Sequence, residues 1–177
     1  MTTDPIDVLE EYLLDPSAEK LAALRSAVLS APGFDPHGSV AELAARCREE
    51  YPGDPERCAE EMLRSIGAGM PGLLLSLSAH AHLARALDVL GQREQAARER
   101  QMAATSLELM RADGDGSESA PFAALRIEDE YDLVAASRRQ SRSQRLVERN
   151  DEFFDVHELT DGAELWFRLL WRSRGGA

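Results

Sequence analysis

The sequence lacks the features of a secreted, membrane-spanning or nucleotide-binding protein. Its first residues have no basic start followed by an apolar run, so no secretory signal is expected. No stretch approaches the roughly 18 apolar residues that a membrane helix needs. Glycine-rich phosphate loops, Walker motifs and dinucleotide fingerprints are absent as well. We therefore expect a cytoplasmic protein that makes no membrane contact and uses no cofactor.

Residues that bind metals or form disulfides are scarce. Cys47 and Cys58 are the two cysteines, and their spacing fits neither a Cys-x-x-Cys redox pair nor a zinc knuckle. Free structural thiols are the favoured interpretation, and a disulfide is the alternative. His80 and His82 are two residues apart on an expected helix, so they point to different faces and cannot form the i, i+4 pair of a metalloprotease helix. No metal site is predicted.

Basic residues are outnumbered, with 20 Lys and Arg against 32 Asp and Glu and a net charge of -12. The acidic excess lies mainly in residues 1–116, which carry 20 acidic and 11 basic residues. The mean electrostatic field of such a chain repels nucleic acid and anionic membranes. The charge therefore predicts no nucleic-acid partner and favours a basic protein or peptide.

Apolar residues recur at helical spacing through the first two thirds of the chain. Asp54 is a plausible N-cap for a helix that has Pro55 at its first position, and Gly91 is a plausible left-handed C-cap. Six helices are predicted: residues 5–15, a helix capped by Ser17, residues 39–50, a helix that starts after Asp54, residues 73–90 and residues 92–111.

The hydrophobic period changes after Gly116. Strands are predicted at 122–127, 142–147, 152–159 and 165–171, with a short helix that begins at 128–130. Asp161-Gly162 is a strong hairpin turn between the last two strands. The pattern predicts an α+β fold, in which antiparallel helical hairpins are followed by a small antiparallel β-sheet. The expected division is a helical part at 1–113 and a β-rich part at 114–177, packed on one shared core.

The hairpin at 73–111 resembles a tetratricopeptide unit. Small residues such as Ala84, Gly91, Ala96 and Ala103 fall where that repeat brings its two helices close together. One unit cannot hide its apolar face alone, so the earlier helices are expected to stack on it.

An ordered series of short segments runs along nearly the whole chain and resembles an uncharacterised bacterial family, the domain of unknown function numbered four-nine-one-nine. The resemblance implies a tetratricopeptide-like helical part with a small β-rich end, and it brings no reaction, cofactor or catalytic residue. The segments are Leu24-Arg25, Phe34 to Gly38, His80, Leu90-Gly91, Gly114-Asp115-Gly116, Glu130-Tyr131-Asp132, Ser143 to Val147, Phe154-Asp155-Val156 and Leu165-Trp166-Phe167.

The repeat-like hairpin and the lack of a catalytic constellation favour a non-catalytic protein–protein interaction module. The predicted partner surface lies near His80 and Arg98. The alternative is a small hydrolase or ligand-binding enzyme with a site at the helix–sheet junction. Its candidate residues are Asp115, Glu130, Tyr131 and Asp155.

Two charged segments have competing interpretations. The turn at 113–117 places oxygen ligands at alternate positions, but Glu118 and Ala124 stand where a calcium loop needs glycine and glutamate, so a tight turn is favoured. Five arginines form the basic cluster Arg138, Arg139, Arg142, Arg145 and Arg149. Three interpretations are open for these arginines. They protect an edge strand from aggregation by their charge, they pair with acidic residues, or they bind phosphate.

Overall fold

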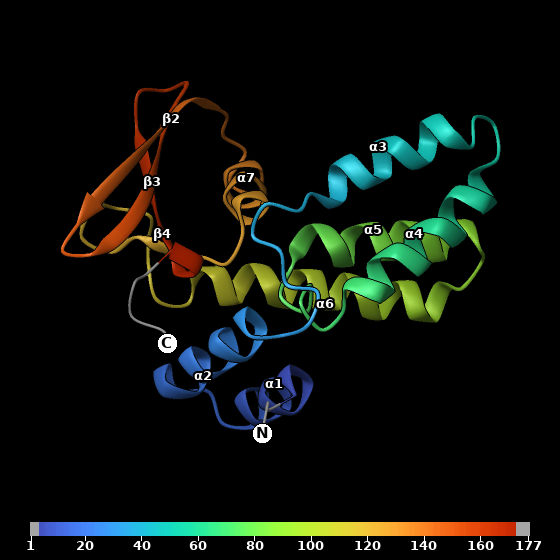
Figure 1. Ribbon diagram of the computed structural model, residues 1–177, viewed down its shortest axis with the longest axis horizontal. Coiled ribbons are helices and arrows are strands. Elements are labelled where there is room, and N and C mark those ends of the chain that lie inside the picture. The colour runs from blue at the N-terminus through green and yellow to red at the C-terminus, as the bar shows by residue number, and fades with distance from the viewer. Residues whose placement is uncertain (1–3, 173–177) are drawn as a thin grey trace. The chain divides into compact units, whose positions relative to one another are not determined.

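The computed structural model describes residues 4–172 and divides the chain into two compact units, Met1–Ser106 and Leu107–Ala177 (Figure 1). The division falls inside one long helix, α6 (Arg93–Arg111), whereas the sequence predicts a boundary at 113. Within residues 4–172, no helix combines the length and the apolar content needed to cross a membrane.

Unit 1 is helical, and its helices start where polar side chains cap them. The side chains of Ser17, Ser39, Asp54 and Ser76 each accept a hydrogen bond from a backbone N–H in the first turn of the helix that follows. The predicted N-cap at Asp54 and proline at the first helical position are confirmed. The helices are α1 (Pro5–Leu14), α2 (Ala18–Leu29), α3 (Val40–Glu50), α4 (Pro55–Gly69), α5 (Leu77–Val89) and the first part of α6.

Helices α3, α4 and α5 share an apolar cluster that contains several small side chains. Each helix contributes residues three or four apart, which places them on one face. The small side chains allow the helix backbones to approach closely, so the three helices form one packed group (Figure 1). The buried members are Val40, Ala44, Cys47, Ala59, Met62, Ile66, Ala79, Leu83 and Ala86.

Helices α5 and α6 form the predicted helical hairpin. Gly91 between them has a φ of 73°, the left-handed conformation that glycine adopts without strain. Side chains from the two helices meet in the pairs His80–Glu99 and Asp88–Arg100, and both figures show the helices side by side. Helix α5 begins at Leu77 rather than at 73. The closer likeness to a tetratricopeptide unit stays a prediction.

Unit 2 contains a four-stranded sheet with the strand order β1-β4-β3-β2. Strands β2, β3 and β4 form the predicted antiparallel meander. Strand β1 pairs in parallel with β4, so the sheet is mixed and the prediction of a wholly antiparallel sheet is wrong in this detail. The elements are β1 (Phe122–Ala124), α7 (Ile127–Ala136), β2 (Ser141–Arg149), β3 (Glu152–Leu159), β4 (Glu164–Leu169) and a 3₁₀ turn, η1 (Leu170–Arg172).

The two faces of this sheet differ in chemistry. One face carries the apolar cluster of Phe154, Val156 and Trp166, and the guanidiniums of Arg145 and Arg149 lie over the indole ring at 5.7 and 4.8 Å from its centroid. The other face carries Asp155 and His157, whose positions alternate with that cluster along β3.

Four of the five clustered arginines pair with carboxylates inside unit 2. The pairs are Arg139–Asp161, Arg142–Glu158, Arg145–Glu164 and Arg149–Glu118. This charge is therefore largely matched within unit 2, which favours the interpretation that the cluster pairs with acidic residues.

The buried apolar faces of the helices should dominate the stability of unit 1. Leu24 on α2 is fully buried, whereas Leu13 on α1 is 53% exposed. We expect Leu24→Ala to lower the free energy of unfolding by about 2–5 kcal/mol, because it removes buried methyl groups and leaves a cavity. The matched substitution Leu13→Ala should cost less than about 1 kcal/mol. Urea unfolding followed by circular dichroism measures both, and equal costs would contradict the described core.

Candidate functional site

Three of the four residues predicted for an enzyme site lie together in unit 2. Glu130 and Tyr131 lie on α7, and Asp155 lies on β3. Gln144 of β2 joins them: it accepts a hydrogen bond from the Tyr131 hydroxyl at 2.8 Å and donates to the Asp155 carboxylate at 2.6 Å. Its amide nitrogen also lies 3.4 Å from Glu130. The structure therefore brings these three predicted residues into one polar cluster.

The cluster continues through His157, which is absent from the predicted site. Its Nε2 lies 2.9 Å from the Glu130 carboxyl group, and its Nδ1 lies 3.0 Å from the Ser141 hydroxyl. Glu130 and His157 are both fully buried. Asp155 and His157 share a strand face, so alternation along β3 could have found the histidine. Ser141 and Gln144 could not be found that way, because their positions depend on the register between β2 and β3.

Burial keeps the central pair neutral. It raises the pKa of Glu130 to about 9, with the nearby carboxylates of Asp155 and Asp129 adding to the effect. Burial also lowers the pKa of His157. At neutral pH the protonated Glu130 therefore donates to His157 Nε2, and His157 Nδ1–H donates to Ser141. The Ser141 hydroxyl then donates to the backbone carbonyl of Ser143 at 3.2 Å.

This direction of hydrogen bonding does not suit a catalytic triad. A general base needs a free lone pair that faces the serine hydroxyl, but the nitrogen of His157 that faces Ser141 carries a proton. The imidazole also has no exposed surface through which a substrate could reach it. The cluster therefore acts as a hydrogen-bond network that joins α7 to β2 and β3, in which Glu130 Oε1 is buried without a partner among the described residues.

Asp115, the fourth predicted residue, makes its hydrogen bonds within its own turn. Its carboxylate accepts from the Ser117 backbone N–H at 2.9 Å, and hydrogen bonds with Ser117 lower its pKa. Gly116 has a φ of 81°, and a Cβ there would collide with the rings and methyls of Phe122 and Leu165. This geometry fits the predicted tight turn. Within residues 4–172, no three His, Cys, Asp or Glu side chains are grouped so that they could hold a metal ion.

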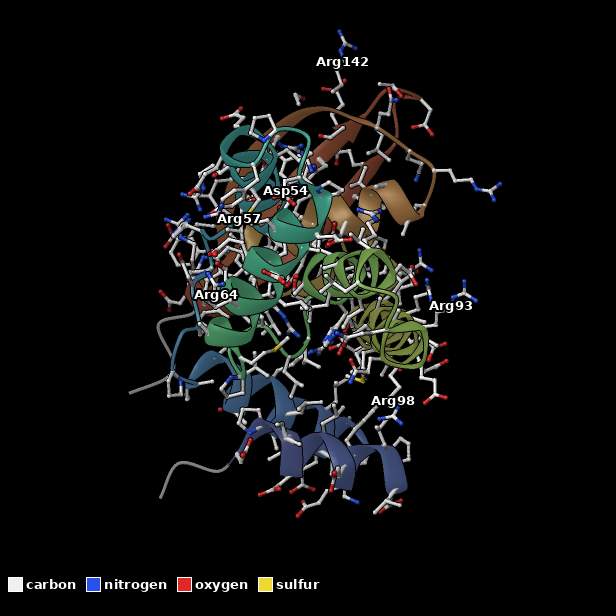
Figure 2. All side chains as sticks on the ribbon, turned by 90° about the vertical axis from the view of Figure 1, so that its right-hand side faces the viewer. Asp54, Arg57, Arg64, Arg93, Arg98 and Arg142 are labelled. Carbon is white, nitrogen blue, oxygen red and sulfur yellow. The ribbon has the colours of Figure 1, made fainter. Side chains whose placement is uncertain are left out.

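The predicted partner surface near His80 needs correction. His80 is 4% exposed, its Nδ1 lies 2.6 Å from Glu99, and its Nε2 lies 2.8 Å from the carbonyl of Leu74. These two contacts occupy both ring nitrogens of His80 inside unit 1, so the side chain is not available to a partner. Arg98 is exposed on α6 (Figure 2). His80, the other residue of the predicted partner surface, is buried and is not part of the surface.

A pocket of about 460 Å³ opens among α3, α4 and α5. Its walls come from the end of α3, the start of α4 and the second half of α5. Figure 2 marks the α4 side, where Asp54 and Arg57 lie at the start of the helix. Most lining residues are apolar, and the polar ones are few. The lining consists of Ala44, Arg48, Tyr51, Gly53, Pro55, Cys58, Ala59, Met62, His82, Arg85, Ala86 and Val89.

Two arginines of this pocket make no ion pair with any described residue. Arg48 and Arg85 are exposed, and neither makes an ion pair with a carboxylate anywhere in residues 4–172. Some other arginines of unit 1 are engaged: Arg57 stacks on the Tyr51 ring at 4.7 Å, and Arg100 pairs with Asp88. The pocket therefore combines an apolar lining with two arginines that make no ion pair. The carboxylates of Glu50 and Glu61 also lie near the lining: a hydrogen bond with Glu50 and the charges of both raise the pKa of Tyr51.

The sequence contains part of the signal for this pocket. His82, Arg85, Ala86 and Val89 recur at i, i+3, i+4 and i+7, so they share one face of α5. What the sequence does not show is that this face meets the ends of α3 and α4.

The neutral state of Glu130 predicts how stability depends on pH. An unfolded chain loses this proton near the ordinary pKa of 4.5, whereas the folded protein keeps it up to about 9. Between these values the folded state binds more protons, so raising the pH lowers stability through this group. Glu130→Gln has no such proton and still offers an N–H to His157. We expect the stability of Glu130→Gln relative to the native protein to increase as the pH rises.

Urea unfolding at acidic, neutral and alkaline pH measures this difference. Glu148→Gln, at an exposed position of β2, is the matched control and should show a far smaller trend. Glu130→Ala removes the partner of His157 and leaves a cavity, so it should cost about 2–5 kcal/mol. A constant difference between Glu130→Gln and the native protein across this range would contradict a protonated Glu130.

The pocket should bind a small apolar anion, and 8-anilinonaphthalene-1-sulfonate provides both properties with a fluorescence signal. We expect Arg48→Ala or Arg85→Ala to raise its Kd roughly tenfold, because each removes a charge-assisted contact. Arg46→Ala, at an exposed α3 position outside the pocket lining, is the matched control and should leave the Kd unchanged. Equal affinities for all three variants would show that the dye binds elsewhere.

Comparisons with known proteins give no family for this chain: no family model, no curated protein and no solved structure matches it. The proposed function therefore depends on the contacts, charges and pocket of the described residues.

Proposed function

We propose that the protein is a non-catalytic protein-interaction module whose helical unit receives a segment of a partner protein in the pocket among α3, α4 and α5. The observation that supports this most strongly is the apolar lining flanked by Arg48 and Arg85, two guanidiniums without an internal carboxylate. Such a site suits an apolar side chain with an acidic group beside it. A cytoplasmic location is part of the same proposal.

The size of the pocket fits this kind of ligand. A volume of about 460 Å³ lies within the range of ordinary ligand sites. It has room for one or two large apolar side chains, each of which contributes about 1.5–3 kcal/mol when it is fully buried. A short helix or an extended segment could present such side chains to a groove between helices.

The two lining arginines favour an acidic group in the partner segment, whereas the overall composition predicts a basic partner. Charges in water are screened beyond about 8–10 Å at physiological salt. A segment in the pocket therefore responds mainly to Arg48 and Arg85 and to Glu50 and Glu61 beside the lining, and less to acidic residues on distant helices. The long-range field of the chain would slow the approach of an acidic segment, but the contact itself would be favourable.

The alternative function, a small hydrolase, has one observation in its favour. Glu130, Tyr131 and Asp155 converge, and Ser141, His157 and Glu130 form a chain of serine, histidine and acid. The buried imidazole and the direction of its hydrogen bonds argue against reactivity. We therefore prefer the interaction module.

Selection from a random peptide library displayed on phage tests this proposal. The full chain is the target, and the double variant Arg48→Glu/Arg85→Glu is the counter-target. Both substitutions are at exposed positions, so the fold should persist. We expect the enriched peptides to carry net negative charge and at least one bulky apolar residue, because these groups match the pocket.

Fluorescence anisotropy with a synthetic copy of the most enriched peptide then gives the affinity. The native protein should bind it at least tenfold more tightly than the double variant does, which corresponds to about 1.4 kcal/mol. Enrichment of basic peptides, or equal binding by both proteins, would rule out this pocket as the partner site.

A further inference from the structure

Strand β2 lies at one edge of the sheet in unit 2, and no strand of residues 4–172 pairs with its outer side (Figure 1). Its inner side pairs with β3 from Ser141 to Arg149, and the turn and loop hydrogen bonds of the described residues do not involve its backbone. Most of its side chains are exposed. A long, exposed edge of this kind offers a row of N–H and C=O groups to another strand.

The exposed apolar surface of unit 2 lies beside this edge. Leu146 on β2 is 49% exposed and Tyr131 on α7 is 47% exposed, and they are the two exposed large hydrophobic side chains that unit 2 has within residues 107–172. The Tyr131 hydroxyl donates to Gln144, which is two residues from Leu146 along the strand. Both apolar groups therefore lie on the sheet face that carries α7.

The arginines of β2 do not guard this face of the edge. Arg145 and Arg149 lie on the opposite face from Leu146, over the indole ring of Trp166, and each pairs with a carboxylate of unit 2. On the face of Leu146, the nearest charged side chain of the strand is Glu148. The edge therefore has an apolar centre, and most of the positive charge around it is already paired.

We propose that two copies of the chain associate through this edge, with their β2 strands antiparallel and Leu146 of one copy opposite Leu146 of the other. The two sheets then form one continuous sheet about a two-fold axis, and backbone hydrogen bonds hold the strands together. The inference does not involve the pocket of unit 1, so it holds or fails independently of the proposed function.

The side chains of β2 favour this register. When two copies of a strand pair antiparallel about a two-fold axis, the residue at the axis faces its own copy, and residues on either side of it face each other. With Leu146 at the axis, two exposed leucines cover each other and Arg145 faces Val147. No two like charges then lie directly opposite each other.

Other registers are less favourable. An axis at Arg145 would place that residue opposite its own copy, and an axis at Val147 would place Arg145 opposite Arg149. Like charges directly opposite each other are destabilising. An axis at Gln144 would move the pairing onto the bulge near Ser141, which interrupts a regular ladder.

Sedimentation velocity of the full chain over a range of concentrations measures the association. Stable interfaces bury about 1,200–2,000 Å², and one strand pair is small by comparison, so we expect a reversible dimer that forms as the concentration rises. Leu146→Lys should weaken the dimer at least about tenfold, because two ammonium groups replace the apolar contact at the axis. Leu13→Lys, a substitution of equal charge at a similarly exposed leucine of α1, should dimerise like the native protein.

A mixture of two variants tests the register itself. Leu146→Lys and Leu146→Glu should each associate weakly alone and should form a 1:1 heterodimer when mixed, because an ammonium then faces a carboxylate across the axis. Leu13→Glu mixed with Leu146→Lys is the control and should give no such gain. Circular dichroism checks that each variant keeps the native fold, and formation of the heterodimer shows that both variants are folded at this edge.

Three results would overturn the inference. They are a native chain that stays monomeric up to about 1 mM, a dimer of Leu146→Lys as strong as that of the native protein, and a mixture of Leu146→Lys and Leu146→Glu that stays monomeric. Peptide binding by the pocket is measured separately, so its failure would reject the proposed function and leave the dimer unaffected.

Discussion

The close packing of α3, α4 and α5 through small side chains is the constraint on which the helical unit depends. Ala44, Ala59 and Ala86 belong both to the shared apolar cluster and to the pocket lining. Small residues let the backbones approach, but they do not fill the space where the three helices diverge. The packing that stabilises the unit therefore also creates its pocket, and larger residues at these positions would change both.

In unit 2, a buried polar network fixes the position of α7 on the sheet. Glu130 on α7 contacts His157 on β3, and Ser141 on β2 contacts the same imidazole. Burial of a charged pair would carry a large desolvation cost, but burial of a neutral acid with a neutral imidazole costs less. An apolar interface would tolerate a shift of α7 along the sheet. These directional bonds favour a single position, because a shift leaves buried polar groups without partners.

Local features of the sequence predicted much of the fold, but pairings between residues distant in sequence could not be predicted. Asp54 and Gly91 mark helix ends through their own backbone and side-chain chemistry, and the confirmed α+β class follows from the change of hydrophobic period. The parallel pairing of β1 with β4 has no such local signal, because α7 and two strands separate them. Ser141 shows the same limit: a register shift between Ser141 and Ser143 reverses the alternation and places Ser141 on the face of His157.

The same distinction applies to charge. A net charge of -12 describes the whole chain, but a partner contacts only what remains after internal pairing. The arginine cluster at 138–149 looked like the basic site of the sequence, yet four of its five members pair with carboxylates of unit 2. Arg48 and Arg85 lie outside that cluster and make no ion pair among residues 4–172. For the interaction module that we propose, the partner surface is therefore better sought among arginines without an ion pair than in the total charge.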